Sequence, residues 1–256
     1  MFLLQKATQV TNGSAAPEPE DVESWLREHY AYPAARSDGG PFIRANFVAS
    51  IDGAATAEGR SGALGSEGDR MLFGILRELS DAVLVGASTA LTEDYGIPSA
   101  RADGSRPTLV LASRSLRIPD DYTLAFDAGT LIATCTAAPR DRRERLIAGG
   151  ATLIDCGAET VEPAALRAAL GERELHRVIC EGGPRLHGDL IAAGVLDQLA
   201  LTVSPHVASG EGPRIAHGAA PRDGLAPARL TQLIGDDEGY LYFLWDLPSG
   251  PAGDSR

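Results

Sequence analysis

Lysine is nearly absent from this chain of 256 residues: Lys6 is the single lysine, and all other basic residues except the five histidines are arginines. A Schiff-base enzyme needs an internal lysine, and a Walker A loop ends in lysine followed by serine or threonine. One lysine close to the first residue satisfies neither requirement. The sequence therefore excludes both enzyme classes.

Cysteine is also scarce and shows no metal-binding spacing. Cys135, Cys156 and Cys180 lie far apart, each within or beside an apolar stretch, and no C-x-x-C pair occurs. The five histidines form no H-E-x-x-H or comparable pattern. We expect three buried free thiols, no disulfide framework and no metal.

Long hydrophobic runs are missing as well. No apolar stretch reaches the roughly 18 residues that a membrane span requires, and MFLLQKATQV is too short for a signal peptide. The net charge of −12 and the pI near 4.8 disfavour nucleic acid or an anionic membrane as a partner. We expect a cytoplasmic protein, in which an anionic cofactor would need local arginines or backbone amides.

Strand and helix patterns alternate through most of the chain. Segments that are short, apolar and rich in β-branched residues suit strands buried on both faces; they are 41–50, 82–85, 108–112, 130–134, 152–155, 177–180 and 198–203. Helical patterns follow Ser66 and cover 140–148, 163–170 and 184–194. Residues 229–234 and 239–247 predict a hairpin. This order predicts an α/β fold with a mainly parallel sheet and an antiparallel C-terminal edge.

We expect one domain, over residues 41–247. Residues 1–40 are interpreted as a peripheral segment with a short helix in DVESWLREHYAYP, and residues 248–256 as a disordered tail. No internal repeat or interdomain linker appears.

Polar side chains and glycines follow four of the predicted strands, at the sheet edge where open α/β proteins bind ligands. The first segment contains Ser50 and Asp52, which could face a substrate, although Asp52-Gly53 could equally be a simple turn. The second is V-G-A-S-T, in which Gly86 precedes a short helix with Ser88 as a possible N-cap and Thr89.

The third and fourth segments suit a nucleotide. Ser113-Arg114 offers a hydroxyl and a guanidinium for a phosphate monoester such as the 2′-phosphate of NADPH, or else a solvated loop arginine. Gly182 and Gly183, in E-G-G-P-R-L, precede a helix and let amides approach a pyrophosphate, or else serve tight packing. This segment lies too late in the chain for a Rossmann fingerprint.

Together, S-I-D-G, V-G-A-S-T, S-R and E-G-G-P resemble, in order and spacing, the reductase domain of the bifunctional riboflavin-biosynthesis protein, which has a dihydrofolate-reductase-like fold. The resemblance covers about residues 41–247. It implies a homodimer in which NADPH reduces an aminopyrimidine ribosyl phosphate, of the 5-amino-6-ribosylaminouracil 5′-phosphate type, to its ribityl form. No deaminase signature (H-x-E with P-C-x-x-C) occurs, so a stand-alone reductase is expected.

The resemblance also implies roles for individual residues. The expected cofactor-binding residues are Thr56, Gly86, Thr89, Ser113, Arg114, Gly182, Gly183, Arg185 and Leu186. The expected substrate-binding residues are Asn46, Ser50 and Ser66; Asn46 is included because residues 46, 48, 50 and 52 share one face of an extended strand. Asp52 and Glu181 are the two candidates for proton transfer, directly or through water.

Two positions depart from the family's pattern. Asn46 stands where a lysine is usual, four residues before the serine of S-I-D-G, and LTEDYGIPSARADG replaces a segment that usually carries an arginine for the substrate phosphate. Two alternatives therefore stay open. One is a related reductase acting on a pterin or dihydrofolate, and the other is a noncatalytic nucleotide-binding protein with the same fold.

Overall fold

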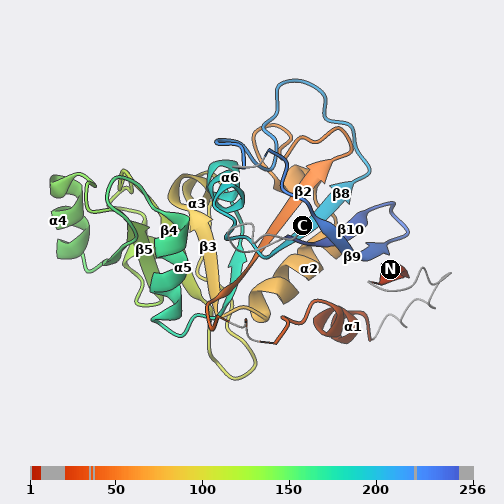
Figure 1. Ribbon diagram of the computed structural model, residues 1–256, viewed down its shortest axis with the longest axis horizontal. Helices are drawn as coiled ribbons and strands as arrows, with labels where there is room; N and C mark the ends of the chain where they lie inside the picture. Colours follow the sequence, from red (N-terminus) through yellow and green to blue (C-terminus); the bar gives the residue numbers. More distant parts are fainter. Residues whose placement is uncertain (1, 7–20, 35, 37, 222–223, 248–256) are drawn as a thin grey trace, which may run out of the picture.

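The structure is a computed structural model that describes residues 2–6, 21–34, 36, 38–221 and 224–247 (Figure 1). Its centre is a ten-stranded sheet with the strand order β1-β9-β10-β8-β2-β7-β3-β4-β5-β6. The prediction of a mainly parallel sheet with an antiparallel C-terminal edge is confirmed. None of the described helices is both long enough and apolar enough to span a bilayer.

The parallel part of the sheet runs from β8 to β6. Its strands are β8 (Gln198–Ser204), β2 (Phe42–Ser50), β7 (Arg177–Cys180), β3 (Ala82–Gly86), β4 (Thr108–Ala112), β5 (Thr130–Thr134) and β6 (Thr152–Asp155). The antiparallel part adds β10 (Leu241–Asp246), β9 (Arg229–Gly235) and β1 (Phe2–Lys6). The predicted hairpin is the β9–β10 pair.

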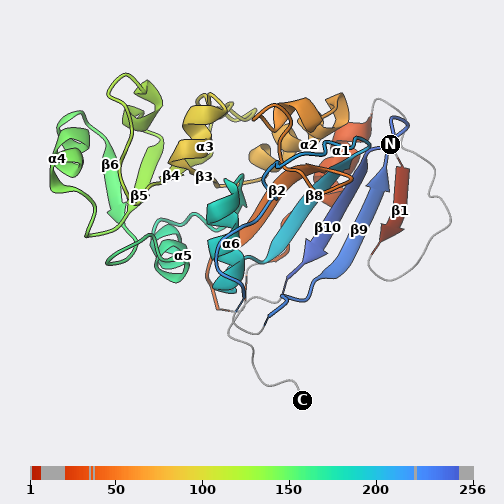
Figure 2. The ribbon, with the colours of Figure 1, turned by 90° about the horizontal axis from the view of Figure 1, so that it is seen from above.

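Helices lie on both faces of the sheet (Figures 1 and 2). One core cluster joins the sheet to α1 (Val22–His29), α2 (Glu67–Glu78), α3 (Ala87–Thr92) and α4 (Arg140–Ala148). A second cluster joins its other face to α5 (Pro163–Gly171) and α6 (Pro184–Ala192). Alternate residues of β3 point into the two clusters, Val83 into the first and Leu84 into the second, because strand side chains alternate.

The helix starts follow the local signals in the sequence. The Ser66 hydroxyl accepts from the Asp69 amide at 3.0 Å and caps α2, whose Leu72, Ile75 and Leu76 are buried. Proline occupies the first turn of both α5 and α6. The sequence therefore determines where α2 and α6 begin, and both helices contribute residues to the candidate site.

The segment ahead of residue 41 contributes to the same core. Leu26 and Tyr30 of the first helix region are fully buried, and β1 pairs with β9 at the sheet edge, where the sequence predicts no strand. Arg44, also fully buried, donates to the Gln198 side chain at 2.7 Å and to the Tyr30 carbonyl at 2.6 Å. The domain boundary at residue 41 stays an expectation, but α1 is tied to β2.

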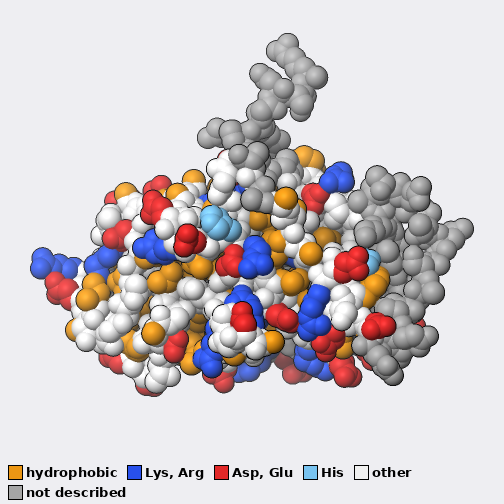
Figure 3. Space-filling model, turned by 90° about the horizontal axis from the view of Figure 1, so that it is seen from below, with side chains coloured by type: hydrophobic (Ala, Val, Ile, Leu, Met, Phe, Trp, Pro, Cys, Tyr) orange, Lys and Arg blue, Asp and Glu red, His pale blue; other side chains and the backbone are white. Residues whose placement is uncertain are grey.

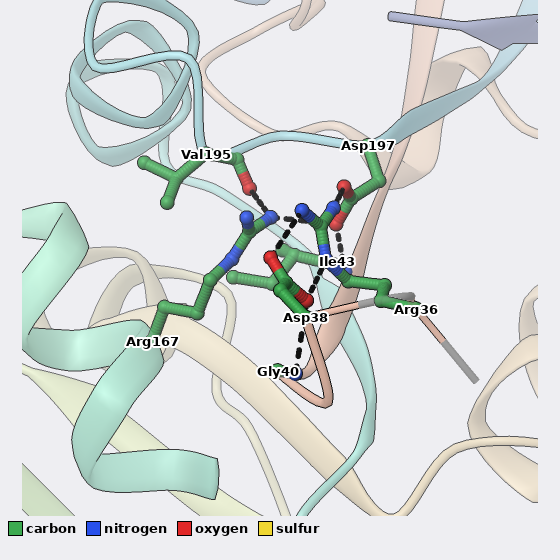
Figure 4. Close-up of polar contacts among 7 residues, drawn as sticks. All are labelled: Arg36, Asp38, Gly40, Ile43, Arg167, Val195 and Asp197. Atoms are coloured by element: carbon green, nitrogen blue, oxygen red, sulfur yellow. Dashed lines mark hydrogen bonds and ion pairs between the residues drawn. The ribbon is translucent and has the colours of Figure 1, made fainter. Parts of the chain in front are cut away.

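An ion-pair cluster fixes the start of β2 beside the start of β8 (Figure 4). The Asp197 side chain is 2 % exposed and accepts from the Ile43 amide at 2.7 Å, from Arg167 of α5 at 2.6 Å and from Arg36. Arg36 also pairs with Asp38 at 2.8 Å. One buried carboxylate therefore connects two strands and a helix.

Candidate active site

Two neighbouring cavities open at the end of the sheet where the parallel strands finish. The first, called here the β2–α2 cavity, has a volume of about 390 Å³. The second, called the β4–α6 cavity, has a volume of about 410 Å³. Thr89, Gly183 and Pro184 line both, so the two spaces share one wall. The two cavities are therefore adjacent.

A buried ion pair lies in the wall of the β2–α2 cavity. Both Arg77 donors, Nε and Nη2, lie 2.7 Å from the two carboxylate oxygens of Glu181, whose side chain is 2 % exposed. The Arg77 guanidinium also stacks over Phe73 and Tyr95. Burial, and then the Glu181 charge, raises the pKa of Tyr95. Glu181 therefore lines the cavity with its carboxylate held in one orientation by Arg77.

Asn46 and Thr56 also line the β2–α2 cavity. Asp69, in the first turn of α2, lines it too, and burial raises the pKa of its carboxyl. The remaining lining comes from β2, from the segment after it, and from α2, α3 and their following turns; it includes Phe47, Val48, Ser61, Arg70, Glu93 and Asp94.

Most of the expected cofactor residues line the β4–α6 cavity: Gly86, Thr89, Ser113, Arg114, Gly183, Arg185 and Leu186. The glycine turn has little room for side chains. A Cβ at Gly183 would lie 2.3 Å from the Thr89 hydroxyl oxygen. Gly182 does not line the cavity, but its carbonyl accepts from the Gly86 amide at 2.6 Å, and its φ of +88° favours glycine. The turn before α6 therefore has no side chains that would keep a ligand away from its backbone amides.

Besides Gly182, three expected site residues lie outside both cavities: Ser50, Asp52 and Ser66. The Ser50 hydroxyl donates to Asp52 at 2.5 Å, and the other Asp52 contacts are the amides of Ala208 and Ser209, at 3.0 and 2.7 Å. Ser50 and then these amides lower the pKa of Asp52 to about 2. Ser66 caps α2 and shares a hydrogen bond with the Tyr242 hydroxyl at 3.2 Å. The structure thus gives Ser50, Asp52 and Ser66 contacts that hold the fold.

The sequence analysis missed the contribution of α2. Arg70, Phe73 and Arg77 line the β2–α2 cavity, and their spacing of three and four residues places them on one helix face. That stripe lies beside the buried stripe of Leu72, Ile75 and Leu76 and is visible in the sequence once both are drawn on one helix. Arg101, the arginine in the departing segment, instead donates to the Glu78 carbonyl at 2.8 Å.

Among the described residues, no group of three or more histidine, cysteine, aspartate or glutamate side chains is arranged to hold a metal ion. The three cysteines are buried and free. Burial raises the pKa of Cys156 to about 11 and that of Cys180 to about 12, so neither thiol is a ready nucleophile.

The arrangement of motifs on this fold matches a known family. The family model described as the RibD C-terminal domain matches residues 41–241. The chain belongs to this family. The resemblance drawn from the sequence motifs is thereby confirmed, and so is the dihydrofolate-reductase-like fold.

The matches to individual relatives cover different shares of those proteins. A 2,5-diamino-6-ribosylamino-4(3H)-pyrimidinone 5′-phosphate reductase of Methanothermobacter thermautotrophicus is 28% identical over 198 residues, covering 75% of this chain and 91% of the relative. Riboflavin biosynthesis protein RibD of Bacillus amyloliquefaciens is 27% identical, over 67% of this chain and 50% of that protein. This chain therefore matches about half of RibD.

A solved structure resembles most of this chain. It is a pyrimidine reductase-like protein of Corynebacterium diphtheriae, with a TM-score of 0.75 and 26% sequence identity. The match covers 86% of this chain and 98% of the other.

Proposed function

We propose that this chain is an NADPH-dependent reductase that converts the ribosylamino group of an aminopyrimidine ribosyl phosphate to a ribitylamino group. The observation that carries the proposal is the shared wall of the two cavities at Thr89, Gly183 and Pro184. A dinucleotide bound in the β4–α6 cavity would extend past these three residues and present its nicotinamide to a substrate in the β2–α2 cavity. The names of the relatives supply the substrate class.

The residues of the β4–α6 cavity fit a phosphorylated dinucleotide. Arg114 and Ser113, just after β4, line the cavity and offer a guanidinium and a hydroxyl that can donate charge-assisted hydrogen bonds to a 2′-phosphate. The free amides at the start of α6, behind Gly183, suit a pyrophosphate. NADP rather than NAD is therefore the proposed cofactor, and when bound it supplies a hydride.

In the β2–α2 cavity, Asn46 and Thr56 are proposed to orient the pyrimidine and the nicotinamide, respectively. The open-chain substrate contains a C=N bond, and reduction adds hydride to its carbon and a proton to its nitrogen. Glu181 is the proposed group that directs this proton, directly or through water, because its carboxylate is buried in the cavity wall and held by Arg77. Asp52, outside both cavities, is proposed to position the neighbouring loop.

A single assay tests the proposal. Purified protein is mixed with NADPH and, separately, with the diaminopyrimidinone ribosyl phosphate, its uracil counterpart and dihydrofolate. We expect NADPH oxidation with an aminopyrimidine phosphate only. Oxidation with dihydrofolate alone would support the pterin or folate alternative. Nucleotide binding without turnover of any of the three would support a noncatalytic protein.

We further propose that two copies associate through the antiparallel part of the sheet. Leu201, Phe243 and Leu233 are register partners across β8, β10 and β9, and all three are half-buried. No described helix covers this face of the three strands (Figure 2). An apolar row of this kind suits self-association.

Phe243→Glu should convert the dimer to a monomer in light scattering coupled to gel filtration, because a charge cannot be buried at an apolar interface without cost. Leu225→Glu is the control, since Leu225 is 95% exposed and outside the strand row. A monomeric wild-type chain would contradict the proposal.

Nucleic acid and membranes are not proposed as partners. In Figure 3, which views the molecule from below Figure 1, acidic and basic side chains are interspersed and no broad basic patch is visible on that face. Together with the net charge of −12, this favours a small-molecule substrate. We also propose that the protein is cytoplasmic, which cell fractionation can check.

A further inference from the structure

The loop after β8 connects the walls of both cavities. Residues 206–217, called here the strap, begin beside the segment that follows β2. The Ile51 amide donates to the His206 carbonyl at 2.9 Å, and the Ala55 amide donates to the Pro213 carbonyl at 2.7 Å. Asp52 accepts from two strap amides, those of Ala208 and Ser209. These hydrogen bonds hold the first part of the strap against residues 51–55, next to the β2–α2 cavity.

The far end of the strap is seated on α6. The His217 amide donates to the Pro184 carbonyl at 3.1 Å. Nδ1 of His187 lies 2.9 Å from the Ile215 carbonyl. Burial lowers the pKa of His187 to about 4, so its ring is neutral near pH 7, and Nδ1 must carry the proton because a carbonyl only accepts.

A glycine on α6 allows this close approach. A Cβ at Gly188 would lie 2.2 Å from the carbonyl oxygen of His217 and 2.9 Å from its carbonyl carbon. Both atoms belong to the strap backbone, so an added methyl group could be accommodated only if the strap moved. The position of His217 is therefore set by backbone contacts, which leaves its imidazole available for another partner.

His217 is exposed and lines the β4–α6 cavity, together with Arg185 and Gly183. Its amide is bonded to the first residue of α6, next to the free amides proposed for the pyrophosphate. Arg114, in contrast, lies just after strand β4 and not at α6. The cavity thus has a strand side, which suits the 2′-phosphate, and a helix side, where His217 lies.

We propose that His217 is a cofactor-binding residue whose imidazole donates a hydrogen bond to the pyrophosphate of the dinucleotide, and that Gly188 and the strap position it there. The inference rests on the proposed function. Because NADPH and NADH share the pyrophosphate and differ at the 2′-phosphate, His217 should contribute equally to both. The strap would then connect the segment preceding Thr56 to the cofactor.

The test is isothermal titration of NADPH and of NADH into wild-type and variant proteins. His217→Ala should weaken both nucleotides by the same factor, about 10- to 150-fold, as expected for one hydrogen bond to a charged group. Gly188→Ala should reproduce this pattern with the histidine still present. Arg214→Ala is the matched control: it removes a cation from the same strap, at an exposed position outside the cavity lining, and should change neither constant.

Each other outcome is decisive. Unchanged binding of both nucleotides by His217→Ala would overturn the inference even if Gly188→Ala fails to fold. A loss confined to NADPH would place His217 at the 2′-phosphate and overturn the pyrophosphate assignment. Failure of the wild-type protein to bind either nucleotide would instead overturn the proposed function.

Discussion

Arg77 and Glu181 form a two-point ion pair in the wall of the β2–α2 cavity, with both donor–acceptor distances at 2.7 Å. The arginine comes from α2 and the glutamate from the end of β7, so the pair joins elements 104 residues apart in sequence. A carboxylate held at both oxygens keeps one orientation. The proposed proton-transfer role of Glu181 is tested by the variants of this pair.

Glu181→Gln should lower turnover of the aminopyrimidine phosphate about 100-fold or more, a typical general acid–base contribution, because the amide cannot carry the proton or the charge. NADPH affinity should change little. Steady-state kinetics with a parallel nucleotide titration checks this. Arg77→Lys, which keeps the charge but loses the two-point geometry, should show a smaller loss. Near wild-type turnover in Glu181→Gln would exclude a catalytic role for this carboxylate.

Arg114→Ala should weaken NADPH about 10- to 150-fold and leave NADH nearly unchanged. The reason is the loss of one charge-assisted contact to the 2′-phosphate, worth about 1.5–3 kcal/mol. Dissociation constants for both nucleotides check it. Arg117→Ala, a nearby exposed arginine outside the cavity lining, is the control. Equal losses for NADPH and NADH would indicate that Arg114 has a structural role.

Gly183→Ala should greatly reduce binding of both nucleotides while circular dichroism shows a folded chain. The added Cβ would lie 2.3 Å from the Thr89 hydroxyl oxygen, so the Thr89 side chain, which lines both cavities, must move. Gly74→Ala is the matched control, because a Cβ there meets nothing within 4 Å. Unchanged affinity in a folded Gly183 variant would show that the turn does not approach the cofactor.

Asp52→Asn should destabilise the protein at neutral pH without abolishing turnover. Ser50 and two strap amides lower the pKa of Asp52 from 3.8 to about 2. A carboxyl whose pKa is lowered on folding stabilises the fold above its unfolded pKa. That contribution is lost as the pH falls from about 4 towards 2, so the melting temperatures of wild type and variant should converge there. A 100-fold loss of turnover at unchanged stability would return Asp52 to the catalytic candidates.

Asp197→Ala should lower the free energy of unfolding by about 3–5 kcal/mol, because it leaves Arg36 and Arg167 without their buried partner and the Ile43 amide without its acceptor. Urea denaturation measures the loss. Asp38→Ala removes the exposed partner of the same cluster and should cost no more than about 1 kcal/mol. Similar losses in the two variants would contradict the central role given to Asp197.

Much of the fold could be predicted from local sequence. The β-branched apolar runs identify β4, β5, β6 and β7 with the observed bounds, because strands buried on both faces leave a continuous hydrophobic signal. β1 gives no such signal: it is a short edge strand whose pairing with β9 joins distant parts of the chain. Edge pairing of this kind depends on the completed sheet, which local patterns do not report.

Part of the candidate site could also be predicted from local sequence. Motifs at strand ends identified most of the β4–α6 cavity, since parallel strands bring their ends to one edge. The strap and the roles of Asp52 and Ser66 could not be found in this way. Asp52 and Ser66 use their oxygens on backbone amides, and a motif cannot distinguish such a contact from one with a ligand.

The two cavities are lined by residues from different strand ends, and this has a consequence for redesign and for natural variation. Ser113 and Arg114 line the β4–α6 cavity, whereas Asn46 and Arg77 line the β2–α2 cavity. Under the proposed assignment, substitutions after β4 should exchange one dinucleotide for the other without altering the residues that line the β2–α2 cavity. Coenzyme preference and substrate preference should then change independently.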